Sequence, residues 1–154
     1  MKTKLHNDFY TLIQPVLQDA GYTFRILPEG QFLVHNGDIH FTIKQLPAPK
    51  GSTYERVLLE SRFKDDRAKV LFEEEGVLLI TNRLSGIYPE FNVVCSNDGR
   101  VRIRYSCDII KPEDLLPHIT YACGFFEKIQ DEAMQAIVDA YALFLNKHSN
   151  KTNK

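Results

Sequence analysis

The chain has 154 residues, of which 44% are apolar and 25% charged, and its formal net charge is −1. This length and composition predict a soluble globular protein with a single domain and one core. The near-neutral charge argues against nucleic acid or an anionic membrane as a partner, and no apolar run is long enough to span a bilayer.

The amino-terminal segment predicts a cytoplasmic protein that begins with an amphipathic helix. Its first residues, MKTKLHNDFY, lack the apolar run of a secretory signal. From Leu5 to Ala20, apolar side chains recur at spacings of three and four and form one helical stripe. Pro15 supplies no N–H, so we expect it to kink or break this helix. Gly21 follows where a left-handed C-cap is needed.

Four strands are predicted after this helix, at residues 22–27, 31–35, 38–44 and 54–63. The Asn36-Gly37 pair predicts a two-residue hairpin between the second and third strands. The segment Leu46–Ser52 holds two prolines and a glycine, which predict a loop. In the fourth strand, Val57 and Leu59 alternate with polar residues, and Leu58 falls on the outward, polar face.

Residues 68–85 favour a helix, although a short buried strand remains an alternative. The run Glu73–Glu75 favours an early helical turn through the helix dipole. Gly76 costs a helix about 1 kcal/mol relative to alanine, so we expect the regular part to start after it and to end near Gly86. The apolar run Val77–Ile80 also fits a buried strand, and periodicity cannot decide over four residues.

The best-defined strand register lies in residues 91–108, FNVVCSNDGRVRIRYSCD. Two runs rich in β-branched and aromatic residues flank an Asn-Asp-Gly turn, which predicts a hairpin. A two-residue turn would mix the apolar and arginine-bearing faces, whereas a three-residue loop ending at a left-handed Gly99 pairs Ser96 with Arg100. We expect the second register because it buries the apolar set. That set is Phe91, Val93, Cys95, Val101, Ile103 and Tyr105; the other face holds Asn92, Val94, Ser96, Arg100, Arg102 and Arg104.

A long final helix completes the chain. Pro112 predicts a short first turn, and Pro117 is expected to separate that turn from a helix with a broad apolar stripe. Residues 147–154 are polar and are expected to form a flexible tail, which leaves a domain at residues 1–146. The element order α-β-β-β-β-α-β-β-α predicts an α+β fold, an antiparallel sheet flanked by helices.

No pattern predicts catalysis, a cofactor or a metal, so we expect no enzyme. The cysteines, Cys95, Cys107 and Cys123, form no C-x-x-C pair and are expected to be buried free thiols. His35 and His40 flank a turn, and we interpret them as solvated hairpin residues rather than metal ligands. Phosphate-binding glycine loops are absent. The acidic run at 73–75 is read as solvated surface.

Five residues are candidates for contact with a partner. Arg100, Arg102 and Arg104 alternate on one strand face, which is typical of an exposed surface protected by charge. The sharper hypothesis is a binding surface for an acidic peptide or phosphate, because arginine forks suit carboxylates and phosphates. Leu58 and Val94 lie on outward faces among polar residues, where a partner segment would bury them. Strand addition at a free sheet edge is the other route.

The order of elements and three local patterns resemble the YbjN family and the wider fold of type III secretion chaperones. These patterns are the paired strands of residues 22–44, the helix segment VLLITNRLS at 77–85, and the strand pair of residues 91–109 with its acidic-glycine turn. Pro15 and the proline-bearing loop depart from the family pattern. The resemblance implies a non-enzymatic, protein-binding or regulatory module, often a homodimer. A small ligand-sensing domain and a Cys/His-dependent enzyme remain the alternatives.

Overall fold

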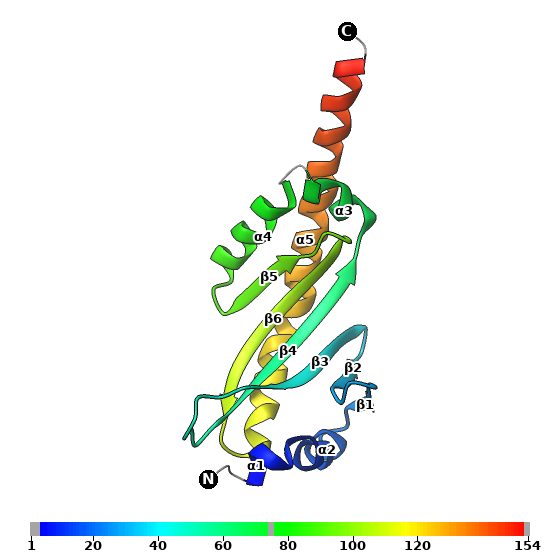
Figure 1. Ribbon diagram of the computed structural model, residues 1–154. Coiled ribbons are helices and arrows are strands. Elements are labelled where there is room, and N and C mark those ends of the chain that lie inside the picture. Colours follow the sequence, from blue (N-terminus) through cyan, green and yellow to red (C-terminus); the bar gives the residue numbers. More distant parts are fainter. Residues whose placement is uncertain (1–3, 74–75, 153–154) are drawn as a thin grey trace. The chain divides into compact units, whose positions relative to one another are not determined.

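The computed structural model describes residues 4–73 and 76–152. Its strands form a six-stranded antiparallel sheet in the order β1-β2-β3-β4-β6-β5, so β1 and β5 are its edges (Figure 1). This confirms the α+β class. The elements are α1 (Lys4–Asn7), α2 (Phe9–Asp19), β1 (Thr23–Ile26), β2 (Phe32–Asn36), β3 (Ile39–Leu46), β4 (Glu55–Lys64), α3 (Asp66–Glu73), α4 (Gly76–Ile87), β5 (Phe91–Cys95), β6 (Arg100–Ile109), the 3₁₀ turn η1 (Pro112–Asp114) and α5 (Leu115–Thr152).

The chain divides into two compact units. Unit 1 comprises Met1–Ser61 and Arg104–Phe126, and unit 2 comprises Arg62–Ile103 and Glu127–Lys154. The strands β4 and β6 and the helix α5 each begin in one unit and end in the other. The predicted single domain at residues 1–146 stays a prediction, because a division by compactness does not test whether either unit folds alone.

The core of unit 1 lies between one face of β2, β3 and β4 and the helices. Alternate strand residues are fully buried there, and the Phe41 ring lies 6.0 Å from that of Phe126 on α5. The strand pair β2–β3 turns at Gly37-Asp38, one residue later than predicted, with Asn36 opposite Ile39. The apolar side chains still lie on the predicted faces of the two strands, because the observed register differs from the predicted one by an even number of residues.

The predicted helix breaks at Pro15 and Pro117 are wrong, and a kink at Pro15 stays a prediction. The break near the amino terminus falls at Asp8, and α2 continues through Pro15. Pro15 removes the hydrogen bond that the carbonyl of Thr11 would accept, but both residues are exposed, so water can satisfy that carbonyl. Pro117 does not divide the last helix either. It is the third residue of α5, where a backbone N–H has no partner within the helix.

Two helix ends follow from local chemistry. Gly21 has φ of +84° and ends α2: its N–H donates to the carbonyl of Gln18, and the next N–H donates to Leu17. This is the predicted left-handed cap. Asp65 caps α3, because its Oδ1 accepts the backbone N–H of Arg67 at 2.8 Å.

Residues 68–73 and 76–85 are helical in α3 and α4, which rejects the strand alternative for Val77–Ile80. Helix α4 begins at Gly76 and ends at Ile87, close to the predicted limits. Two residues of the acidic run 73–75 lie outside the described residues. At the carboxyl end, α5 continues to Thr152, past the predicted end at residue 146. Flexibility of residues 147–154 remains a prediction. None of the helices in the described ranges combines the length and apolar character needed to cross a membrane.

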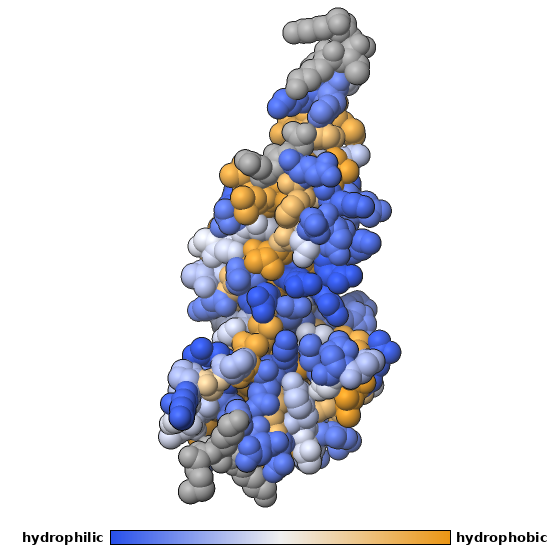
Figure 2. Space-filling model, viewed as in Figure 1, coloured by the Kyte–Doolittle hydropathy of each residue, from blue (hydrophilic) through white to orange (hydrophobic). Residues whose placement is uncertain are grey.

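The hairpin of β5 and β6 has the predicted register. The N–H of Ser96 donates to the carbonyl of Arg100 at 2.9 Å, and Gly99 has φ of +86°. Phe91, Val93, Val101, Ile103 and Tyr105 are buried, whereas the three arginines of the opposite face are half-buried. Hydrophilic side chains dominate the view over β4 and β6 in Figure 2. The hairpin and its register are therefore confirmed, and of the predicted apolar face only Cys95 is half-buried rather than buried.

Candidate functional site

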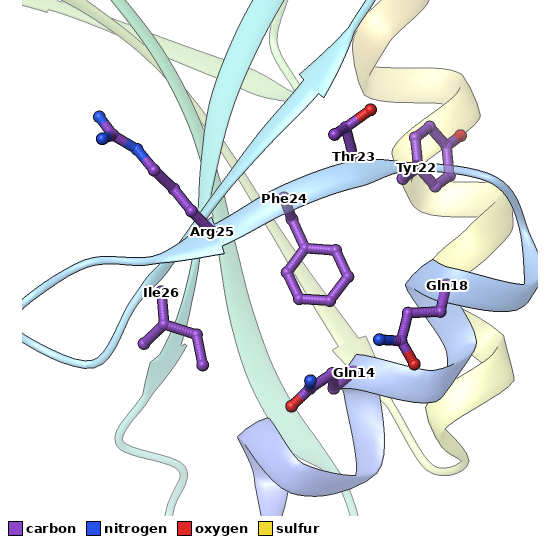
Figure 3. A pocket seen from close by; sticks show the side chains of 7 residues that line it. All are labelled: Gln14, Gln18, Tyr22, Thr23, Phe24, Arg25 and Ile26. Carbon is purple, nitrogen blue, oxygen red and sulfur yellow. The ribbon is translucent and has the colours of Figure 1, made fainter.

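A groove runs along the edge strand β1 in unit 1. It has a volume of about 490 Å³, opens to solvent, and is lined by Gln14 and Gln18 of α2 together with residues 22–26 (Figure 3). Figure 3 shows the side chains of Phe24 and Ile26 on the side of β1 that faces α2, with Thr23 and Arg25 on the other side. The groove thus combines an apolar wall with two amide side chains.

The backbone of β1 is available along this groove. The N–H of Leu27 donates to the carbonyl of Gln31 at 2.8 Å, which marks these two residues as a hydrogen-bonded pair. Bonded and non-bonded pairs alternate along an antiparallel ladder, so Arg25 is bonded to β2 and Phe24 and Ile26 are not. The N–H and C=O groups of Phe24 and Ile26 therefore point away from β2, toward the open edge.

The side chains of β1 are apolar where they flank the groove. The Phe24 ring packs edge-on against Phe32 with centroids 5.3 Å apart, so it is half-buried and fixed in place. Ile26 is 59% exposed. Phe24 and Ile26 together form an apolar surface beside the backbone groups of β1 that are not bonded to β2.

Unit 2 contains a second open groove, of about 480 Å³, between α4 and α5. Ile80, Leu84 and Ile87 supply its apolar floor, and Glu132 and Asp139 lie among its lining residues. Glu132 accepts a hydrogen bond from the hydroxyl of Tyr88 at 2.7 Å. Sequence reasoning missed both grooves, because each depends on how a helix lies beside a neighbouring element.

The predicted contact residues fall in both units. In unit 1, the outward face of β4 and β6 carries two complementary ion pairs: Arg56 Nε lies 3.2 Å from Asp108 Oδ1, and Arg104 Nε lies 3.1 Å from Glu60 Oε2. The contact between Arg104 and Glu60 is an ion pair only, because its geometry does not meet that of a hydrogen bond from Arg104 Nε. Arg104, a predicted partner contact, thus forms an ion pair within its own sheet, and its contact with a partner stays a prediction.

Leu58 does not form the predicted exposed patch. It is 5% exposed and lies midway along β4 between the two residues of the ion pairs, Arg56 and Glu60. Long charged side chains flank it on the same strand face, and the aliphatic stems of such residues readily lie over an apolar neighbour. Val94 is half-buried and belongs to unit 2, together with Arg100 and Arg102.

The histidines do not assemble a metal site. Nδ1 of His35 and Nδ1 of His40 lie 2.6 Å apart on the exposed face of the β2–β3 hairpin. Elsewhere in unit 1, His6 contacts the buried carboxylate of Glu55 at 2.9 Å, and His118 contacts the hydroxyl of Tyr105 at 2.7 Å. Residues 4–73 and 76–152 contain no group of three or more side chains able to hold a metal ion.

Burial disfavours the thiolate form of all three cysteines. Burial raises the pKa of Cys95 and of Cys123 above the ordinary value, and it raises the pKa of Cys107 to about 12. A thiolate, not a thiol, is the nucleophile in cysteine enzymes. These surroundings oppose the activation that a Cys/His mechanism needs.

No protein-family model matches the chain, and none of the curated proteins compared with it is a significant match. The YbjN-like relationship therefore remains a prediction that rests on patterns in the sequence.

Proposed function

We propose that the protein is a non-enzymatic binding module that takes an extended segment of a partner protein on the open edge of β1. The observation that carries this proposal is the pair of unbonded backbone positions, Phe24 and Ile26, beside the groove against α2. A segment that adds as a strand would bond to these positions and lay alternate side chains into the groove. Gln14 and Gln18 offer it further hydrogen bonds.

The edge favours another protein over a second copy of β1. In the antiparallel register that uses both unbonded positions, Arg25 of one copy would lie directly opposite Arg25 of the other. Like charges opposite each other across two strands are destabilising. We therefore expect a partner segment with apolar residues at alternate positions and an acidic residue facing Arg25. A homodimer, which the YbjN-like resemblance also suggests, would need a different surface.

This function agrees with the module implied by the resemblance to YbjN proteins and secretion chaperones, and we expect it to act in the cytoplasm. The ligand-sensing alternative is less well supported, because the grooves beside β1 and between α4 and α5 are open to solvent rather than enclosed. The Cys/His alternative is opposed by the raised pKa values of all three thiols.

The test uses the full chain and a library of seven-residue peptides. We expect selection of peptides with alternating apolar residues, and slower hydrogen exchange at the amides of Phe24 and Ile26 in the complex. Ile26→Glu should weaken binding at least about tenfold. The matched control is Ile110→Glu, since Ile110 is 66% exposed in unit 1 outside the groove. Equal loss in both variants, or protection at other strands only, would overturn the proposal.

A further inference from the structure

The outward face of β4 and β6 in unit 2 has a defined register. The N–H of Asp65 donates to the carbonyl of Gly99 at 3.0 Å. Counting back along the two antiparallel strands, Lys64 lies opposite Arg100 and Arg62 opposite Arg102. The ion pairs Arg56–Asp108 and Glu60–Arg104 of unit 1 obey the same register. Lys64 also acts electrostatically on Asp98, next to Arg100.

The two cross-strand pairs in unit 2 bring like charges together. Arg62 and Lys64 are exposed, and Arg100 and Arg102 are half-buried on the same face. Asp98, in the turn, lies 3.9 Å from Arg100 and offsets one of the four charges. In unit 1 the corresponding pairs on these strands are complementary. Four cations in two adjacent pairs therefore distinguish this end of the strands; we call them the cationic cluster.

Stability alone does not account for the cationic cluster. Like charges directly opposite across two strands are destabilising, and opposite charges in the same places are favourable. Arg102 adds a further cost, because its Nε is buried without a hydrogen-bond partner among the described residues. An anionic ligand would remove both costs. The neighbouring positions beside β6, Val94 on β5 and Ser96 directly after β5, bring no acid to the face.

We propose that the cationic cluster, Arg62, Lys64, Arg100 and Arg102, binds an extended acidic segment of a protein. Successive pairs are two residues apart along the strands, roughly 6.6–6.8 Å, which is the spacing of alternate side chains in an extended chain. A Glu-x-Glu segment would thus present one carboxylate to each pair, and arginine holds carboxylates through paired hydrogen bonds.

The chemistry favours protein over nucleic acid. The chain as a whole has a formal net charge of −1, which does not attract a long polyanion. Single-stranded nucleic acid also needs aromatic rings for base stacking, whereas the residues beside the cluster on β5 are aliphatic or small and polar. This site is separate from the β1 edge in position and in ligand chemistry, so either proposal can fail alone.

The probe is a synthetic peptide with glutamate at alternate positions, titrated into the full chain at low salt. We expect saturable binding that weakens as salt rises. The double variant Arg62→Gln/Arg102→Gln should reduce affinity at least about tenfold. The matched control is Lys44→Gln/Lys50→Gln, which removes two exposed cations from unit 1 outside the β1 groove and should leave affinity unchanged.

Thermal unfolding separates a binding role from a structural one. Removing like-charge repulsion should leave the Tm of Arg62→Gln/Arg102→Gln at or above that of the wild type, while binding is lost. A lower Tm, or no saturable binding of the acidic peptide, would overturn the proposal. So would equal binding of a peptide with glutamine in place of glutamate, or tighter binding of a single-stranded oligonucleotide.

Discussion

Each cysteine of the chain lies where its thiol loses contact with water. Cys107 and Cys123 are 7% exposed, and Cys95 is half-buried beside the turn that joins β5 to β6. Desolvation disfavours the charged form of a thiol, so the pKa of each is raised. The sequence could predict buried free thiols from their apolar neighbours, but not the size of the effect on Cys107.

We expect all three thiols to react slowly with Ellman's reagent at neutral pH in the native protein. A pKa of about 12 lowers the thiolate fraction of Cys107 at least about a hundredfold relative to an unfolded chain, so it should react last. The measurement compares native rates with rates in urea, with single Cys→Ser variants to assign each phase. One cysteine that reacts faster in the native protein than in urea would contradict this and revive the Cys/His alternative.

Leu58 shows where residue-level prediction ends. Its alternation with Val57 and Leu59 placed it correctly on the outward face, but its burial depends on the charged side chains around it. Besides Arg56 and Glu60 on its own strand, its neighbours come from β3 and β6, and the pairing of Leu58 with Lys44 of β3 follows only from the sheet order and register. The ion pair of Arg104 was not predictable for the same reason, because its partner Glu60 is far away in sequence.

At the scale of elements, the hairpin was predictable because pattern and turn chemistry agree. Alternating apolar residues and the Asn-Asp-Gly turn select one register, and the structure adopts it. The helix breaks were not predictable from Pro15 and Pro117, because a proline's effect depends on its place in the helix and on its access to water. The groove at β1 needed the position of α2, which no local pattern gives.

Two features of this hairpin require glycine at position 99: the backbone conformation and the lack of space for a side chain. Gly124 provides a control for the substitution of glycine by alanine. Its φ is +86°, and a Cβ there would lie 2.5 Å from the carbonyl oxygen of Asp65. We expect Gly99→Ala to lower the free energy of unfolding by about 2 kcal/mol or more. Gly124, in α5, has open space around it, so Gly124→Ala should raise that free energy by roughly 0.5–1 kcal/mol.

Urea unfolding of both variants tests the sign as well as the size. The opposite signs matter, because both substitutions add the same methyl group and differ only in backbone conformation and surroundings. Unchanged stability of Gly99→Ala would mean that the turn can relax away from Asp65. In that case the register of β4 against β6, on which the cationic cluster depends, would also need revision.

For the whole molecule, the near-neutral net charge hides an uneven distribution. Complementary pairs neutralise the outward strand face in unit 1, whereas the cationic cluster in unit 2 leaves like charges adjacent. A formal charge of −1 argued against polyanions but was silent on this local arrangement. Composition therefore limited the class of partner without locating where a partner would bind.

Acid should destabilise both units through carboxylates that accept hydrogen bonds. Side-chain bonds from Arg67 lower the pKa of Asp65, and backbone bonds lower the pKa of Asp98 in unit 2 and of Asp114 in unit 1. Because each folded pKa lies below the unfolded value near 3.8, their stabilisation is complete above that pH and is lost as the pH falls through the folded values. We therefore expect urea midpoints to fall steeply below about pH 4.

The Asp65→Asn variant tests, at a single residue, whether the charge of a carboxylate makes stability depend on pH in the expected direction. The variant loses the charged cap of α3 and the ion pair with Arg67, so it should be less stable than the wild type at pH 7. At pH 2, below the unfolded value of 3.8, the difference should narrow, because the stabilisation from the charged carboxylate is lost as the pH falls through the lowered pKa of Asp65. Urea unfolding at the two pH values measures the gap. A gap that stays constant would show that Asp65 stabilises the protein through shape and neutral hydrogen bonds rather than through its charge.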